Sequence, residues 1–145
     1  MTVAAMIQLE NYDLKSGTPS MTIRQAIDHM VEMNENAIAI VDEDEELAGI
    51  ITDHDVMRAL YKNSTELDEM IVGDWMSVHV KTCSVSAKLA DAMRLMGRHK
   101  LRHLVVEANE TPIAIIGIRA LLSRIHENDE MELNVLRDIA IARSA

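Results

Sequence analysis

Thr52 and Asp55, a hydroxyl and a carboxylate three residues apart, are the side chains in this chain best placed for binding chemistry. An apolar segment ends at Thr52 and an amphipathic one begins at Val56, which predicts a buried strand turning directly into a helix. Free N–H groups at such a helix start attract an anion, for instance a phosphate. A carboxylate there can accept hydrogen bonds from two sugar hydroxyls. The stretch therefore offers a hydroxyl, a carboxylate and backbone donors to a ligand.

A purely structural role explains the same residues. Thr52 or Asp53 can act as the N-cap of the helix, and acidic residues in the first turn suit the positive end of the helix dipole. Thr52 and Asp55 also have the spacing of a capping box. Both roles stay open on this stretch alone, and its altered repetition later in the chain favours ligand binding.

The composition predicts a globular protein with an aliphatic core. The chain has 145 residues, of which 48 % are hydrophobic and only 2 % aromatic, with 11 Met and no Phe. This length suits one compact domain or two small halves that share a core. Met adapts to irregular gaps, so Met30 and Met33 are expected in the core.

Charge and cysteine content limit the possible partners. A formal net charge of −10 opposes binding to nucleic acid, and the one basic cluster, at 99–103, suits a single phosphate group. The single cysteine, Cys83, excludes an internal disulfide and suits a reducing cytoplasm. No apolar run is long enough to span a bilayer, and residues 1–10 lack the pattern of a signal peptide.

Hydrophobic periodicity and turn signals predict the same order of elements twice. The first half has a helical turn at 2–7, an extended piece at 14–16, a helix at 22–34, strands at 37–41 and 47–52, and a helix at 56–61. The second half has an extended piece at 80–82, a helix at 88–99, strands at 103–107 and 113–116, and a helix at 118–126. The acidic residues 42–46 lack the spacing of a calcium loop and are interpreted as a solvated hairpin turn.

Individual positions support this internal repeat. Ala26 and Ala92 are 66 positions apart (92 − 26), as are Ile38 and Leu104. After a one-residue deletion in the second hairpin the spacing becomes 65, which pairs Thr52 with Gly117 and Asp55 with Ala120. Each half is too small to bury a core alone, so the two are expected to pack sheet against sheet.

With these motifs in place, the chain resembles a tandem pair of CBS (cystathionine β-synthase) domains, a Bateman module, of the stand-alone bacterial type. The resemblance rests on Gly-Ile-Ile-Thr-Asp-His-Asp-Val at 49–56 together with segments 37–42, 72–77 and 100–106, and it covers residues 14 to about 126. It implies an α+β fold of two strand–helix–strand–strand–helix repeats. The expected divisions are a first repeat with an N-terminal extension at 1–62, a linker at 63–71, a second repeat at 72–126 and a helical tail at 127–145.

The resemblance also implies a regulatory module that binds an adenosine-containing ligand, such as AMP, ADP or ATP, between the halves. By this similarity Asp55 would hold the ribose hydroxyls with Thr52 beside it, and Leu101 would line the adenine slot. Lys81 and Thr82 would line the same adenine slot, and His54 is a further ligand-binding candidate. Lys100, Arg102 and His99 would be the candidates for binding phosphate.

The second cleft departs from the family pattern. Gly117 and Ala120 stand where the first repeat has Thr52 and Asp55, so the ribose-binding group is missing, although Arg119 could still face a phosphate. One competent cleft and one degenerate cleft are therefore expected. The alternative is that both clefts are empty and the module serves only for dimerisation or as a scaffold.

The sequence contains no pattern typical of an enzyme. There is no nucleophile elbow, P-loop or dinucleotide fingerprint, and no pair among the six histidines has zinc-ligand spacing. We therefore expect no catalytic residues, no metal and no cofactor apart from the regulatory nucleotide. A buried structural role is expected for Cys83.

The tail and the family resemblance together suggest protein partners. Met131, Val135 and Ile139 share a helical face with Leu136 beside it. The tail is expected to pack on its own domain or across a dimer, with docking to an effector protein as the alternative. A homodimer and an unknown effector are the expected partners.

Overall fold

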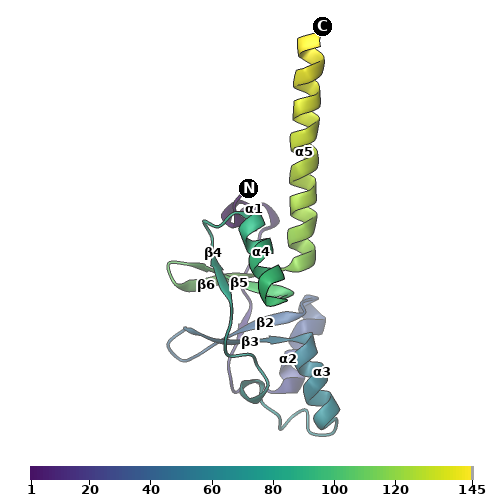
Figure 1. The fold of residues 1–145 in the computed structure, drawn as a ribbon. Coiled ribbons are helices and arrows are strands. Elements are labelled where there is room, and N and C mark those ends of the chain that lie inside the picture. The colour runs from purple at the N-terminus through teal and green to yellow at the C-terminus, as the bar shows by residue number, and fades with distance from the viewer. Residues whose placement is uncertain (145) are drawn as a thin grey trace.

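Two three-stranded sheets lie one above the other at the centre of the molecule (Figure 1). This computed structural model describes residues 1–144, with side chains up to residue 143. The first repeat contains β1 (Ser16–Gly17), α2 (Ile23–Met33), β2 (Ala37–Val41), β3 (Leu47–Thr52) and α3 (Asp53–Lys62). The second contains the 3-10 turn η1 (Val72–Asp74), β4 (Thr82–Ser84), α4 (Leu89–His99), β5 (His103–Ala108) and β6 (Thr111–Gly117). Helices α1 (Val3–Glu10) and α5 (Ile118–Ser144) precede and follow these repeats.

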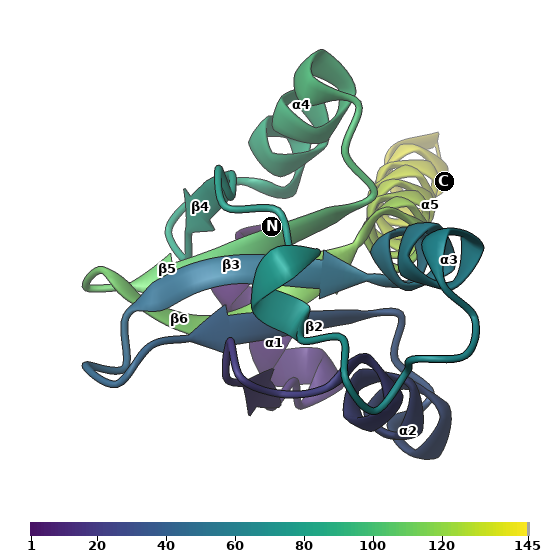
Figure 2. The same cartoon turned by 90° about the horizontal axis from the view of Figure 1, so that it is seen from below.

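The two sheets have the same topology, which confirms the predicted pair of repeats. In each, the first strand runs parallel to the second and the second antiparallel to the third, in the orders β1-β2-β3 and β4-β5-β6. Helices cover the outer face of each sheet, and the inner faces meet through Ala37, Ile50 and Val105 (Figures 1 and 2). Each half thus buries one side of its sheet against the other half.

The apolar face of α2 forms much of the first repeat's core. Ile23, Ala26 and Met30 are buried, and Thr22 begins the helix with a capping box to Gln25. The expectation for Met33 is wrong, because 49 % of this residue is exposed. Met33 is the last residue of the helix, and the chain turns away through the left-handed residue that follows it.

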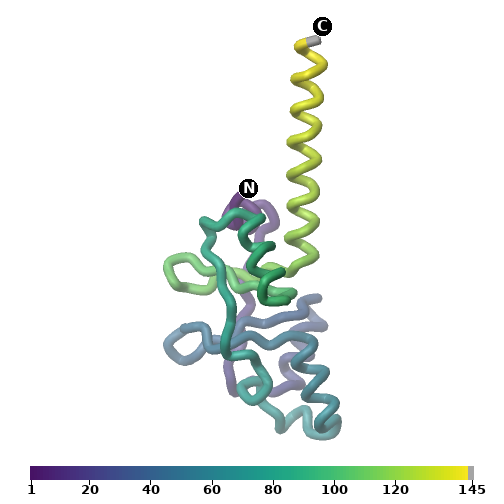
Figure 3. The backbone as a smooth tube through the Cα atoms, in the orientation of Figure 1, coloured from purple at the N-terminus to yellow at the C-terminus, as the bar shows by residue number. Residues whose placement is uncertain are grey.

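Two segments pack on the repeat to which they do not belong in sequence. Val3 and Met6 of α1 lie in the core of the second repeat, and the Val3 N–H donates to the Ala87 carbonyl at 2.8 Å. Val72 of η1 lies in the core of the first repeat. Figure 3 traces how the chain leaves α3, passes the first sheet and rises to β4. Because each of these segments packs on the other repeat, they hold the two halves together.

Several boundaries differ from the predictions. Helix α3 starts at Asp53 rather than 56, and β4 starts at Thr82 rather than at 80. Strand β6 extends from Thr111 to Gly117 because Asn109 and Glu110 alone form the turn, with φ of 51° and 64°. Such a two-residue turn with positive φ leaves its flanking residues free to pair.

Helix α5 is one continuous helix of 27 residues, where a helix at 118–126 and a separate tail were expected. It projects away from the body (Figure 1), and all residues from 129 to 143 are exposed. Packing of the tail on its own domain is therefore wrong. No Gly or Pro follows Gly117, so nothing in the sequence ends the helix early. No helix among residues 1–144 is long and apolar enough to cross a membrane.

Candidate functional site

A cleft of about 500 Å³ lies where the end of β3 faces the segments before β4 and β5. We call it the first cleft. The first repeat contributes the C-terminal end of β3 and the first turn of α3, and the second repeat contributes the opposite wall. Its lining residues are Ile50, Thr52, Asp53, His54, Asp55, Ser77, His79, Val80, Lys81, Lys100, Leu101, Arg102 and His103.

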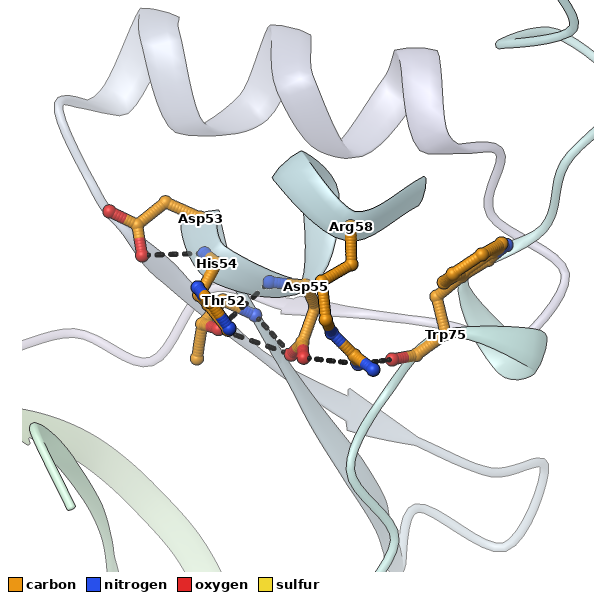
Figure 4. Close-up of polar contacts among 6 residues, drawn as sticks. All are labelled: Thr52, Asp53, His54, Asp55, Arg58 and Trp75. Atoms are coloured by element: carbon orange, nitrogen blue, oxygen red, sulfur yellow. Dashed lines mark hydrogen bonds and ion pairs between the residues drawn. The ribbon is translucent and has the colours of Figure 1, made fainter. Parts of the chain in front are cut away.

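Thr52 and Asp55 form a capping box at the start of α3, as the sequence suggested (Figure 4). The Thr52 N–H and hydroxyl donate to Asp55 Oδ2 at 2.9 and 3.1 Å, and the Asp55 N–H donates back to Thr52 Oγ1 at 3.4 Å. Asp55 is 5 % exposed and is the one buried charged residue among those that the structure describes. The capping role is therefore real, and it occurs inside the cleft.

Arg58 forms an ion pair with the second carboxylate oxygen of Asp55. Its Nη2 donates to Asp55 Oδ1 at 2.9 Å and to the carbonyl of Trp75 at 3.4 Å (Figure 4). A carboxylate has about four acceptor positions, and three of them are used here. A ligand at Asp55 would have to use the remaining position or displace Arg58.

Three cations stand on the wall opposite Asp55. Lys81, Lys100 and Arg102 are exposed, and among residues 1–143 none of them takes part in an ion pair. The protein has a net charge of −10, yet three positive side chains that form no ion pair among residues 1–143 line this cleft. Unpaired Lys and Arg side chains at a concave surface suit a phosphate or another anion.

His103 connects the two repeats beside the cleft. Its Nε2 lies 2.7 Å from Oδ1 of Asn36. Burial lowers the pKa of His103, with Asp53 opposing this shift and Arg102 adding to it. The imidazole is therefore biased towards the neutral form, and a single N–H at Nε2 suffices for the bond to Asn36.

Seven of the eight predicted ligand-binding residues line the first cleft, and Thr82 does not. Thr82 pairs with Val105 as the first residue of β4, and His99 also lies outside the lining. Sequence reasoning missed Ser77, His79 and His103. Ser77 is held at the cleft by paired hydrogen bonds to Ile50 of 3.0 and 2.9 Å, a contact that no local pattern indicates.

A second cleft of about 690 Å³ lies at the equivalent position on the other side of His103. Gly117 and Ala120 line it where Thr52 and Asp55 line the first cleft, and the first turn of α5 has no acidic residue. Asp53, Arg102 and His103 line both clefts. The second cleft therefore has two arginines in its lining, Arg102 and the predicted Arg119, but lacks the Thr52 hydroxyl and the Asp55 carboxylate of the first.

Other parts of the molecule offer less to an anion. A shallow groove of about 760 Å³ runs along α2, and its ionisable side chains are Asp28, His29 and Glu32. Burial, aided by Glu107, raises the pKa of the Cys83 thiol to about 11, so it is a poor nucleophile at neutral pH. No cluster of three or more metal-binding side chains occurs among the described residues.

Comparison with known proteins matches these features to one family. The model of the CBS domain matches residues 11–62 and 72–127. The mitochondrial CBS domain-containing protein CBSX3 of Arabidopsis thaliana is 30 % identical over 118 residues, covering 78 % of this chain and 57 % of that protein. An uncharacterised 17.7 kDa protein of Acidianus ambivalens is 29 % identical over 104 residues, covering 71 % of this chain and 62 % of that protein. The chain spans between 14 and 62 % of the length of the curated relatives it matches.

Solved structures share the fold. A CBS-domain containing protein from Agrobacterium tumefaciens superposes with a TM-score of 0.80 at 22 % identity, over 86 % of this chain and 98 % of that chain. CBSX2, solved in complex with AMP, gives a TM-score of 0.71 at 23 % identity, over 88 % of this chain and 98 % of that chain. With both repeats matched by the family model, the chain belongs to the CBS-domain family as a tandem pair of CBS domains.

Proposed function

We propose that this CBS pair is a regulatory sensor that binds an adenosine-containing ligand, such as AMP, ADP or ATP, in the first cleft. The observation that carries the proposal is the arrangement of one cleft. A buried carboxylate and a half-buried hydroxyl stand on one wall, and three cations that form no ion pair with any residue from 1 to 143 stand on the other. A ribose flanked by phosphate on one side and a flat base on the other has the matching chemistry.

The roles follow from the position of each side chain. Asp55 accepts one hydrogen bond from a ribose hydroxyl at its remaining acceptor position, which contributes about 1.5–3 kcal/mol because the acceptor is charged. Val80 and Leu101 line the space for the base, and Lys100 and Arg102 reach the phosphate. His54 and Lys81 lie at the same rim. The AMP found in the related CBSX2 structure supports this choice of ligand class.

A bound ligand would contact both repeats, because residues of both repeats line the cleft. A nucleotide that contacts α3 and the segment before β5 favours whichever relative position of the halves lets it make all its contacts. In this proposal an effector protein responds to that shift in a reducing, cytoplasmic setting. The module itself does no chemistry, since Asp55 binds and does not react.

Calorimetric titration tests the proposal. We expect AMP, ADP or ATP to bind with one ligand per chain, and Lys100→Ala with Arg102→Ala to weaken binding of the nucleotide more than binding of adenosine. No heat with any nucleotide or with S-adenosylmethionine would favour the alternative, a ligand-free dimerisation or scaffold module. Release of phosphate from the nucleotide would instead indicate an enzyme.

We also propose that the tail of α5 packs against a second copy of the chain. Val135 and Ile139 are 52 % and 45 % exposed, and they continue the face on which Leu121 is buried. Most helical stability in proteins comes from packing of an apolar face, so a partner surface is expected for the exposed residues 129–143.

Sedimentation velocity tests the dimer. The wild type is expected to sediment as a dimer and the Val135→Glu/Ile139→Glu variant as a monomer. A matched variant, Ser123→Glu/Asn134→Glu, adds the same charge at polar positions of the same helix and should stay dimeric. A monomeric wild type would contradict the dimer and favour docking of an effector protein on the tail.

A further inference from the structure

The base side of the second cleft is closed, although the corresponding part of the first cleft is open. His79, Val80 and Lys81 line the first cleft, which measures about 500 Å³. Their counterparts by the repeat spacing are residues 13–15, and these line a separate pocket of only about 20 Å³. That space holds about one water molecule. Something therefore divides the base slot of the second cleft from its remainder.

The partition consists of Tyr12, Glu35, Ala37 and Ile115, which line both the small pocket and the second cleft. The counterparts of the last three are Leu101, His103 and Ile50, and all of them line the open first cleft. These three positions do not close the first cleft. Tyr12 is the fourth residue of the partition, and it differs from its counterpart in the first repeat both in size and in whether it lines the cleft.

The counterpart of Tyr12 is Val78, 66 positions further along the chain. Val78 is 57 % exposed and is not part of the lining of the first cleft. Tyr12 instead is half-buried and packs against the core of the second repeat. An aromatic ring in the second repeat's cleft thus replaces a side chain that points to solvent in the first.

The end of α1 holds this ring in place. The Tyr12 N–H donates to the carbonyl of Ile7 at 3.2 Å. Glu10 lies near the Tyr12 hydroxyl, and burial followed by Glu10 raises the pKa of Tyr12 to about 12. Glu10 Oε1 in turn accepts from Arg124 Nη2 and Nε at 2.7 and 3.1 Å. The N-terminal arm is thereby fastened to the base of α5.

We infer that Tyr12 occupies the base slot of the second cleft, so that its ring takes the place of a purine base and leaves the module with one nucleotide site per chain. The inference rests on the proposed function for the meaning of the slot. Two features then keep a second ligand out: the ring of Tyr12 and the absence of a carboxylate at Ala120.

Two substitutions separate these two determinants. Ala120→Asp restores a carboxylate at the position of Asp55, and Tyr12→Val introduces the residue found at the equivalent position of the first repeat. In AMP titrations we expect one ligand per chain for wild type and for Ala120→Asp, and two for Tyr12→Val/Ala120→Asp. Tyr12→Phe/Ala120→Asp keeps the ring and should stay at one. A second AMP on Ala120→Asp alone, or one AMP on Tyr12→Val/Ala120→Asp, would overturn the inference.

A second measurement separates this inference from the proposed function. If the wild type binds no AMP, the function proposed for the first cleft fails, and melting curves with free adenine then decide the role of Tyr12. Adenine should raise the Tm of Tyr12→Val by about 2–4 °C and leave wild type unchanged. Tyr61→Val, at a tyrosine that is 89 % exposed, is the matched control and should not respond. No rise in Tyr12→Val would count against an open slot.

Discussion

Replacing Asp55 with alanine is expected to weaken AMP binding at least about tenfold and to lower the free energy of unfolding by about 1–2 kcal/mol. Two effects combine, because the same carboxylate caps α3 and faces the first cleft. Loss of one charge-assisted hydrogen bond to the ribose accounts for the affinity. Loss of the bond from the Thr52 N–H, at 2.9 Å, accounts for much of the stability. Calorimetric titration and urea unfolding measure the two effects separately.

Asp91 provides the matched control. It also lies in the first turn of a helix and pairs with an arginine three residues later, Arg94. Its side chain is 51 % exposed, whereas that of Asp55 is 7 % exposed, so the same pair is largely in water. Asp91→Ala is therefore expected to change unfolding by no more than a few tenths of a kcal/mol and to leave AMP affinity unchanged. Equal AMP affinity of Asp55→Ala and wild type would contradict the site.

The repeat and its local signals were predictable from the sequence. Strands 37–41 and 47–52 appear with the predicted bounds, since β-branched residues and polar turns define them on both sides. Thr52 as N-cap also follows from its position between an apolar segment and an amphipathic one. The convergence of Asp55 with Lys100 and Arg102 came from the family resemblance. Periodicity alone does not say which loop of one half faces which helix of the other.

Other features depend on contacts between distant segments. Arg58 has the right spacing to reach Asp55, but its orientation also depends on the carbonyl of Trp75, 17 residues further on. The placement of α1 on the second repeat likewise depends on bonds to residues about 80 positions away, such as Val3 to Ala87. The continuous α5 could have been predicted, because the sequence from Ile118 onward lacks any helix-breaking residue.

Two glycine-to-alanine substitutions are expected to change stability in opposite directions. A Cβ at Gly49 would lie 2.7 Å from the carbonyl oxygen of Ser77 and 2.7 Å from Sδ of Met76. The thioether can turn aside, but the carbonyl is fixed, because it accepts the Ile50 N–H at 3.0 Å. Gly49→Ala therefore has to push the segment at Ser77 away from β3, which is expected to lower the free energy of unfolding by about 1–3 kcal/mol.

Gly97 provides the opposite case on a helix. It lies within α4 without a positive φ, and a Cβ there would meet no atom within 4 Å. Gly97→Ala is therefore expected to raise the free energy of unfolding by about 0.5–1 kcal/mol, because alanine loses less backbone freedom on folding. Urea unfolding of both variants measures this contrast, and a Gly49→Ala variant as stable as wild type would show that the approach of Ser77 to β3 is not needed.

The binding data for the same two variants connect this packing to the site. Ser77 lines the first cleft, and Gly49→Ala displaces it. The Gly49→Ala variant should therefore bind AMP more weakly than wild type, whereas Gly97→Ala should bind AMP as wild type does. If Gly49→Ala lost stability but kept its full affinity, the wall at Ser77 would be shown to contribute nothing to the ligand. The glycine before Ile50 would then serve only the fold, and the ligand would depend on the walls formed by Asp55 and by Lys100 to Arg102.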